Sequence, residues 1–190
     1  MPLSVRLSIE RDAELSSSIR LLVKEVGGNV IGELRFSQEY KADVKRIRSP
    51  QPKPLDCATL DLIILYLEKN LAGAIQVDRL ASECRISEYH FFRRFKATFG
   101  VSPYSLVTSI RLIWAKHLIA TTSLSVPDVS SLVGILNASY FRRQFRRLHN
   151  KSPADVRLLK KRVTDAFELS VSVRSGMQES QELSCSKSSR

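Results

Sequence analysis

Long apolar runs and cysteines are both scarce in this 190-residue sequence. No stretch approaches the roughly 20 apolar residues that a membrane-spanning helix needs. The N-terminal stretch MPLSVRLSIERD contains no apolar core long enough for a secretory signal. Cys57, Cys84 and Cys185 are odd in number and lack the spacing of a metal site, which indicates thiols kept reduced in a cytosol. The sequence therefore predicts a cytoplasmic protein that crosses no membrane.

Acidic residues are too few to balance the basic ones. The chain has 19 Asp and Glu against 30 Lys and Arg, which gives a formal net charge of +11. The excess is uneven: it is +3 in residues 1–54, +9 in residues 55–162 and −1 in residues 163–190. A basic domain indicates a polyanionic partner, either nucleic acid or an anionic membrane surface.

Groups that would indicate catalysis are missing as well. His90, His117 and His149 have no carboxylate or cysteine at the spacing of a catalytic triad or a metal site. We therefore expect no catalytic residue, no metal and no cofactor, and the protein is not expected to be an enzyme.

One unusual segment occurs twice. Residues 89–103 read YHFFRRFKATFGVSP, and residues 139–153 read SYFRRQFRRLHNKSP. Self-similarity of this kind usually means that one supersecondary unit is used more than once. The matched positions are Phe91 with Phe141, Arg93 with Arg143, and Phe95 with Phe145.

Helical periodicity predicts a series of helices after the proline-rich linker SPQPKP at 49–54. Ser87 and Ser102 are suitable N-caps, and Pro103 suits the first position of a helix. Gly100 is expected to end the helix before it. The predicted helices are 57–70, 78–84, 88–98, 103–121, 127–133, 138–148 and 153–162.

The residues before the linker also suggest helices. Apolar residues between 15 and 26 recur at i, i+4, i+7, i+8 and i+11, and Gly27-Gly28 would stop that helix. A weaker helix would place Phe36, Tyr40, Val44 and Ile47 on one side, and no alternating strand pattern is expected. The predicted fold is all-α: a seven-helix module preceded by a short helical segment (1–54) and followed by a disordered, serine-rich tail (163–190).

A short helix, a tight turn and a second helix that carries arginines is the helix-turn-helix arrangement. The second helix needs an apolar face for the scaffold and another face for base edges and phosphates. Arginine suits the face that contacts DNA because its planar guanidinium group forms two hydrogen bonds with guanine or binds a phosphate. An amphipathic helix of this kind is usually only a solvated surface helix, but two copies in register disfavour that interpretation. The candidate DNA-contacting residues are Glu88, Tyr89, Phe92, Arg93 and Lys96 in helix 88–98, and Asn137, just before helix 138–148, with Ala138, Ser139, Arg142, Arg143 and Arg146 within it.

Within the first set, Arg93 is assigned to base readout and Lys96 to a phosphate. Phe92 has two open interpretations: contact with a thymine methyl group, or a cover over Arg85.

Residues 57–162 resemble the DNA-binding domain of AraC/XylS-type bacterial transcriptional regulators, in which one long helix joins two helix-turn-helix units. The resemblance implies a sequence-specific regulator, expected to be an activator, that binds double-stranded promoter DNA in the nucleoid and contacts RNA polymerase. Arg85, Ser130, Ile135 and Asn150 depart from the family's usual turn and core residues. The matching stretches are LASECRIS (80–87), HFFRRFKATFGVSP (90–103), RLIWAKHLI (111–119) and VGILNASYFRRQFRRLHNKSPADVR (133–157).

Many members of this family carry a jelly-roll effector domain upstream, whereas only 54 residues precede the module here. The chain therefore resembles a short or truncated member, and a ligand-binding pocket is not expected. An alternative is a truncated modulator that pairs with a full-length regulator, or with itself, through helices in residues 10–48. A DNA-repair relative would need a cysteine cluster ahead of the module, and the sequence has none.

Overall fold

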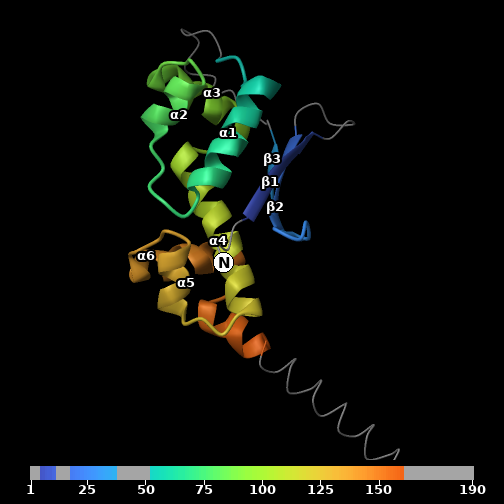
Figure 1. The fold of residues 1–190 in the computed structure, drawn as a ribbon, viewed down its shortest axis with the longest axis vertical. Coiled ribbons are helices and arrows are strands. Elements are labelled where there is room, and N and C mark those ends of the chain that lie inside the picture. The colour runs from blue at the N-terminus through green and yellow to red at the C-terminus, as the bar shows by residue number, and fades with distance from the viewer. Residues whose placement is uncertain (1–4, 12–17, 38–51, 161–190) are drawn as a thin grey trace, which may run out of the picture.

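The computed structural model describes residues 5–11, 18–37 and 52–160 of the chain (Figure 1). Three strands come first and form one antiparallel sheet in the order β1-β2-β3. Six complete helices follow, and a further helix begins at residue 153 and continues to residue 160, the last one described. The elements are β1 (Val5–Arg11), β2 (Ser18–Glu25), β3 (Val30–Ser37), α1 (Cys57–Asn70), α2 (Val77–Glu83), α3 (Glu88–Phe99), α4 (Pro103–Thr121), α5 (Val126–Leu132) and α6 (Ala138–His149).

The helical prediction for the N-terminal segment is wrong. The apolar residues Ile19, Leu21 and Val23 alternate along β2 and are buried on one face of the sheet, which is the period of a strand. Gly27-Gly28 does not end a helix but lies in the turn between β2 and β3, where Gly28 has a φ of +88°. The fold is therefore all-α only after the linker.

The second helix predicted before the linker is also wrong where the structure describes it. Phe36, which that helix would have placed on its apolar side, lies on β3. Tyr40, Val44 and Ile47 lie outside the described residues, as does the C-terminal tail.

The helices predicted after the linker are confirmed, and α1 to α6 each begin and end within one residue of the predicted bounds. Ser102 caps α4 because its hydroxyl accepts a hydrogen bond from the Ser105 N–H at 3.2 Å, and Pro103 occupies the first position. Ser87 occupies the N-cap position of α3, but its side chain makes no capping hydrogen bond.

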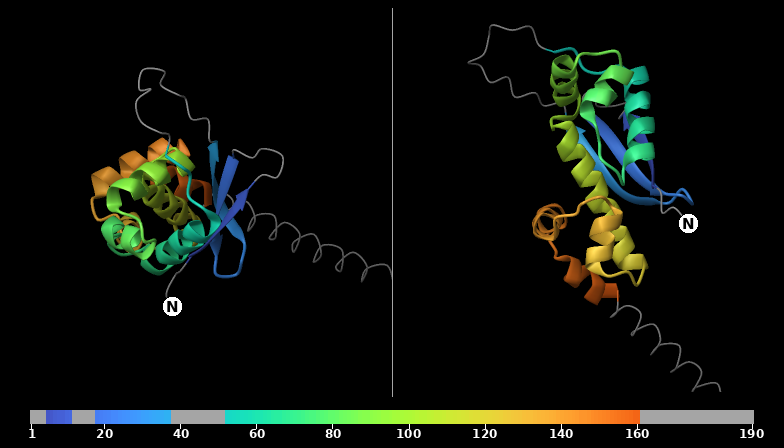
Figure 2. Two further views of the ribbon diagram at one scale, coloured as in Figure 1. Left: turned by 90° about the horizontal axis from the view of Figure 1, so that it is seen from above. Right: turned by 60° about the vertical axis from the view of Figure 1, so that its left-hand side comes forward.

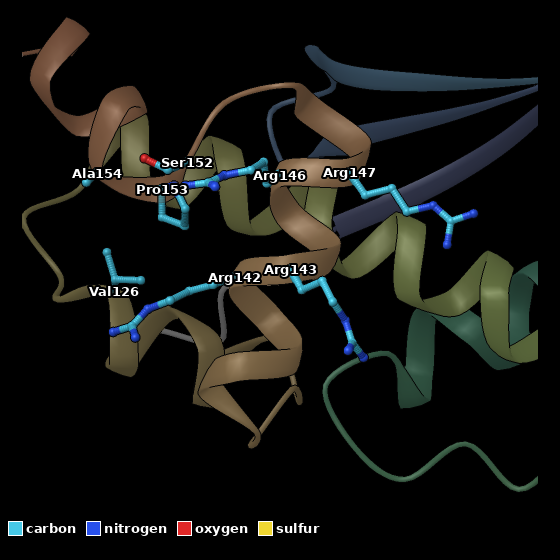
Figure 3. A pocket seen from close by; sticks show the side chains of 8 residues that line it. All are labelled: Val126, Arg142, Arg143, Arg146, Arg147, Ser152, Pro153 and Ala154. Atoms are coloured by element: carbon cyan, nitrogen blue, oxygen red, sulfur yellow. The ribbon is translucent and has the colours of Figure 1, made fainter.

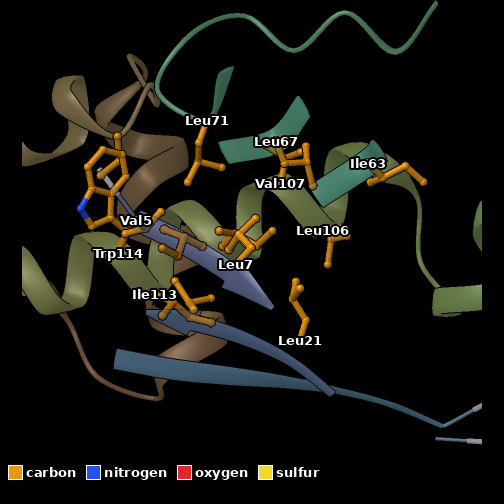
Figure 4. Packing of buried hydrophobic residues seen from close by; sticks show 14 of the residues in the cluster. Val5, Leu7, Leu21, Ile63, Leu67, Leu71, Leu106, Val107, Ile113 and Trp114 are labelled. Atoms are coloured by element: carbon orange, nitrogen blue, oxygen red, sulfur yellow. The ribbon is translucent and has the colours of Figure 1, made fainter. Parts of the chain in front are cut away.

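The sheet packs on α1 and α4 and shares one hydrophobic core with them (Figure 4). Gly32 on β3 lies so close to α4 that a Cβ there would be 2.5 Å from the Ile113 side chain. At the other end of β3, the Phe36 ring meets the Phe99 ring of α3 edge to face, with 5.3 Å between centroids. The N-terminal strands therefore support the first half of the helical module. Figures 1 and 2 show α6 on the opposite side of α4 from the sheet.

Candidate nucleic-acid interface

The two copies of the repeated segment adopt the same internal geometry. Phe91 and Phe95 of α3 are buried with ring centroids 5.6 Å apart and planes inclined by 45°. Phe141 and Phe145 of α6 are buried with centroids 5.6 Å apart and planes inclined by 43°. The predicted apolar faces are confirmed, and each fixes its helix to the scaffold so that the opposite face points outward.

The turn that precedes each of these helices tolerates the departures from the family pattern. Arg85 in the first turn and Gly134 in the second both have positive φ, of 55° and 77°. The hydroxyl of the buried Ser130 donates a hydrogen bond to the carbonyl of Ile135. The Ser130 hydroxyl is therefore paired where it is buried in the second unit.

The two units end their second helices in the same way but differ in the length of the turn before them. Gly100 after α3 and Asn150 after α6 are both left-handed C-caps, so asparagine serves where glycine is usual. The second turn contains one more residue than the first, which leaves Leu136 84% exposed immediately before α6.

On α3, the predicted contact residues lie on the accessible face. Glu88, Tyr89 and Lys96 are exposed, and Arg93 is half-buried with its guanidinium 5.6 Å from the centre of the Tyr89 ring. The Phe92 ring is half-buried, 6.2 Å from the ring of Tyr104.

Arg94, the neighbour of Arg93, has a different role. Its guanidinium donates hydrogen bonds to the carbonyls of Lys53 and Pro54, at 3.2 and 3.1 Å. It also lies 3.5 Å from the Asp56 carboxylate. Arg94 therefore anchors the end of the linker to α3, whereas Arg93 lies on the accessible face. The sequence RR does not separate these roles, but the position of each residue relative to Phe91 and Phe95 does.

On α6, the predicted contact residues are all exposed, and three of them are arginines. Asn137 caps the helix, because its side-chain oxygen accepts a hydrogen bond from the Tyr140 N–H at 2.8 Å. The Arg143 guanidinium lies 5.8 Å from the centre of the Tyr140 ring, as Arg93 lies over Tyr89 in the first unit. The remaining predicted residues, Ala138, Ser139, Arg142 and Arg146, are all exposed.

Four arginines of α6 line a cleft of about 630 Å³ between this helix and the starts of α5 and the last helix (Figure 3). One of them, Arg147, was not among the predicted residues. It could have been found from the spacing Arg142, Arg143, Arg146, Arg147, which repeats at i and i+4. The other lining residues are Val126, Ser152, Pro153 and Ala154.

The basic surfaces of α3 and α6 belong to separate units at the two ends of α4. This helix has 19 residues, so it is roughly 28 Å long at about 1.5 Å per residue. Each unit therefore has its own arginine-bearing surface, and α4 sets how far apart they lie.

His149 takes the place in α6 that Phe99 has in α3. Its ring lies edge to face with Phe145, 4.6 Å between centroids, the same separation as between Phe95 and Phe99. Its Nε2 lies 3.0 Å from the carbonyl oxygen of Leu112 in α4. Burial, with a smaller contribution from the charge of Lys116, lowers the pKa of His149 below its ordinary value near 6.5. The fold therefore favours the neutral imidazole.

Acidification is expected to destabilise the fold through His149. Because its pKa is lower in the folded than in the unfolded chain, the unfolded chain binds more protons. The stabilisation is complete above the unfolded pKa of 6.5 and is lost as the pH falls through the folded pKa. Urea unfolding between about pH 8 and about pH 5 measures the effect. His149→Phe, which introduces the residue that the first copy carries at this position, should weaken the pH dependence. An undiminished pH dependence in His149→Phe would contradict this assignment.

Two kinds of feature are not found in the part of the chain that the structure describes. Among residues 5–11, 18–37 and 52–160, no three His, Cys, Asp or Glu side chains gather in a way that could hold a metal ion. In the same part of the chain, none of the helices has the length and apolar character that crossing a membrane requires.

Comparison with known proteins agrees with this geometry. Residues 80–158 match the family described as "Helix-turn-helix domain". A crystal structure of a transcriptional regulator from Chromobacterium violaceum, titled with "AraC-type DNA-binding domain-containing proteins", has the same fold over 54% of this chain and 92% of its own (TM-score 0.51, 23% identity). The chain carries an AraC-type helix-turn-helix DNA-binding domain. The predicted family and its two-unit fold are thereby confirmed.

Two curated relatives match part of this chain within longer chains of their own. The bifunctional transcriptional activator/DNA repair enzyme AdaA of Bacillus subtilis is 32% identical over 117 residues, which are 62% of this chain and 56% of that protein. The HTH-type transcriptional activator RhaS of Escherichia coli O139:H28 is 32% identical over 98 residues, 52% of this chain and 35% of its own length. The chain thus spans about a third to just over half of these relatives.

Proposed function

We propose that the chain is a sequence-specific regulator of transcription that binds double-stranded DNA through both helix-turn-helix units. In this proposal α3 and α6 each enter a major groove, and the two grooves are successive turns of one duplex. The observation that carries the proposal is the repeated geometry. Two helices with matched buried phenylalanine pairs each carry an arginine over a tyrosine ring on the accessible face.

The charge of the domain supports a nucleic-acid partner. Residues 55–162 carry +9, and four exposed arginines of α6 line one cleft. The amino-terminal end of a helix in the major groove is where base edges are read. Tyr89, Asn137, Ala138 and Ser139 lie at those ends, whereas Lys96 and Arg146 lie about two turns further along and suit phosphates.

Binding of the full chain to a duplex obtained by selection from random sequences tests the proposal. Each phosphate neutralised contributes about −0.9 to the slope of log affinity against log salt concentration, and we expect a slope more negative than about −4. Arg93→Ala should cost about 1–3 kcal/mol and relax the preference at one base position. Lys96→Ala should weaken all sequences alike and reduce the slope by about 1.

These two variants control for each other, because both remove a cation from α3 and only one is assigned to base readout. If Arg93→Ala and Lys96→Ala weakened every sequence equally, Arg93 would not read a base. A salt slope near zero for the wild-type chain would overturn the DNA-binding function itself.

The proposal also includes whether the chain activates or represses transcription. The names of AdaA and RhaS describe them as transcriptional activators. We propose the same direction here, with a contact to RNA polymerase, and transcription in vitro with bacterial RNA polymerase tests it. The modulator alternative depends on an apolar helix face available for pairing. Ile19, Leu21 and Val23 instead lie on β2 and are buried within the chain's own core. Self-association through residues 10–48 stays a prediction.

A further inference from the structure

Arg111, in the middle of α4, lies where the two helix-turn-helix units meet. Its guanidinium donates hydrogen bonds to three main-chain carbonyls: to Leu71 at 2.7 Å through Nε, to Gly134 at 3.0 Å through Nη1, and to Gly73 through Nη2. Leu71 and Gly73 follow α1 in the first unit, and Gly134 is in the turn between α5 and α6 of the second. A single side chain therefore connects the linker helix to both units.

The two units also touch at the same place without a side chain between them. A Cβ on Gly134 would lie 2.5 Å from the carbonyl oxygen of Ala72 and 3.2 Å from Cζ of Arg111. Only a glycine permits this approach, and the φ of +77° at Gly134 also favours glycine. The loop after α1 and the turn before α6 are thus in backbone contact, with the Arg111 guanidinium beside them.

Arginine is the side chain suited to this position. Its planar group presents several N–H donors in fixed directions, whereas a lysine ammonium is a compact point charge that cannot reach three separated carbonyls. Leu71 is the C-cap of α1, so its carbonyl lies at the negative end of that helix dipole and favours a cation. Arg111 is half-buried, and burial lowers the pKa of its guanidinium from the ordinary value. The carbonyls therefore replace the water that the guanidinium has lost.

We propose that Arg111 is a positioning residue that fixes the orientation of the second DNA-reading helix relative to the first. This inference rests on the proposed function of α3 and α6. With Arg111 in place, the chain behaves as one rigid divalent ligand for two sub-sites at a fixed spacing. Without it, the second unit stays attached through α4 and through the contact between His149 and Leu112, but its orientation is less restricted.

The consequence for binding follows from effective concentration. Two modules held in the geometry of their sites gain about 10²–10⁴ in affinity over either module alone, and this gain is lost when the geometry is lost. Replacing Arg111 should therefore weaken binding to a duplex with both sub-sites far more than binding to a duplex with one.

The test uses the full chain and two duplexes from the same selection, one intact and one with the second sub-site scrambled. Arg111→Met, which keeps the aliphatic length, should lose about 10–100-fold in affinity for the intact duplex and about 2-fold or less for the single-site duplex. Arg111→Lys should be intermediate. Arg157→Met is the matched control, because the Arg157 guanidinium donates to the Leu124 carbonyl within the second half of the domain and not between the units. It should leave the ratio of the two affinities unchanged.

A second readout does not depend on DNA. Spin labels on the exposed Ser82 of α2 and Ser131 of α5, in a chain whose three cysteines are replaced, report the distance between the units. The wild-type and Arg157→Met chains should give one narrow distance distribution, and Arg111→Met a broadened or shifted one. If Arg111→Met does not fold, the Arg111→Lys distribution decides.

The outcomes separate the inference from the proposed function. An unchanged distance distribution together with an unchanged affinity ratio in the Arg111 variants would overturn the positioning role. If the wild-type chain bound no duplex, the proposed function would fail, and the distance distributions would still decide whether Arg111 orients the units.

Discussion

Replacing Gly134 with alanine is expected to lower the free energy of unfolding by about 3 kcal/mol or more. Two causes add. A φ of +77° is unfavourable for any residue with a Cβ, and the new Cβ would lie 2.5 Å from the carbonyl oxygen of Ala72. The atom it meets belongs to the backbone of the first unit, so it cannot rotate away as a side chain would. The second unit should therefore be displaced from the first.

Gly100→Ala is the matched control for this substitution. Gly100 has a φ of +70°, close to that of Gly134, but a Cβ there would meet nothing within 4 Å. Gly100→Ala should lower the free energy of unfolding only by the cost of the positive φ, about 1–2 kcal/mol. Urea unfolding of both variants measures the difference, which isolates the contact between the units. Equal losses in the two variants would mean that the approach of Gly134 to Ala72 contributes nothing to stability.

Much of the helical domain could be predicted from the sequence because its signals are local. Ser-Pro pairs start helices, Gly100 and Asn150 end them, and the repeated phenylalanines mark the apolar faces. The outward arginines follow from those faces by helical geometry alone. Their roles as DNA contacts stay a prediction.

The helical prediction fails for the N-terminal sheet because two periodicities compete in a short apolar segment. The stretch from 15 to 26 contains enough apolar residues to fit a helix, and only its neighbours separate the alternatives. The residues of β1 alternate, with Val5, Leu7 and Ile9 on the core side, and Gly27-Gly28 suits a hairpin turn. Read together, these two signals predict the hairpin that the structure contains.

The contacts that Arg111 makes between the two units could not be predicted in the same way. Arg111 lies about 40 positions from Leu71 and 23 from Gly134. Nothing in the local sequence distinguishes it from an exposed arginine on an amphipathic helix. Its contacts depend on how the two units fold back on α4, which is a property of tertiary packing.

Five base pairs inserted between the two sub-sites should weaken binding by about 100-fold or more. The insertion turns the second sub-site half a helical turn away, to the opposite side of the duplex. A flexible tether would recover much of its affinity when ten base pairs are inserted, because the second groove faces the protein again. The contacts of Arg111 and Gly134 hold the two units too rigidly for the second unit to reach a groove about 34 Å further along the duplex. Both insertions should therefore be harmful.

The most direct test of the two-reader account is the dissociation constant of the full chain for three duplexes in one buffer. These are the selected site and the same site with five or ten base pairs inserted between its halves. We expect one chain to bind an asymmetric site tightly, and both insertions to reduce its affinity to that for a single sub-site. Equal affinity for all three duplexes, recovery at ten base pairs, or binding to palindromes alone would contradict the claim that one rigid chain reads both grooves.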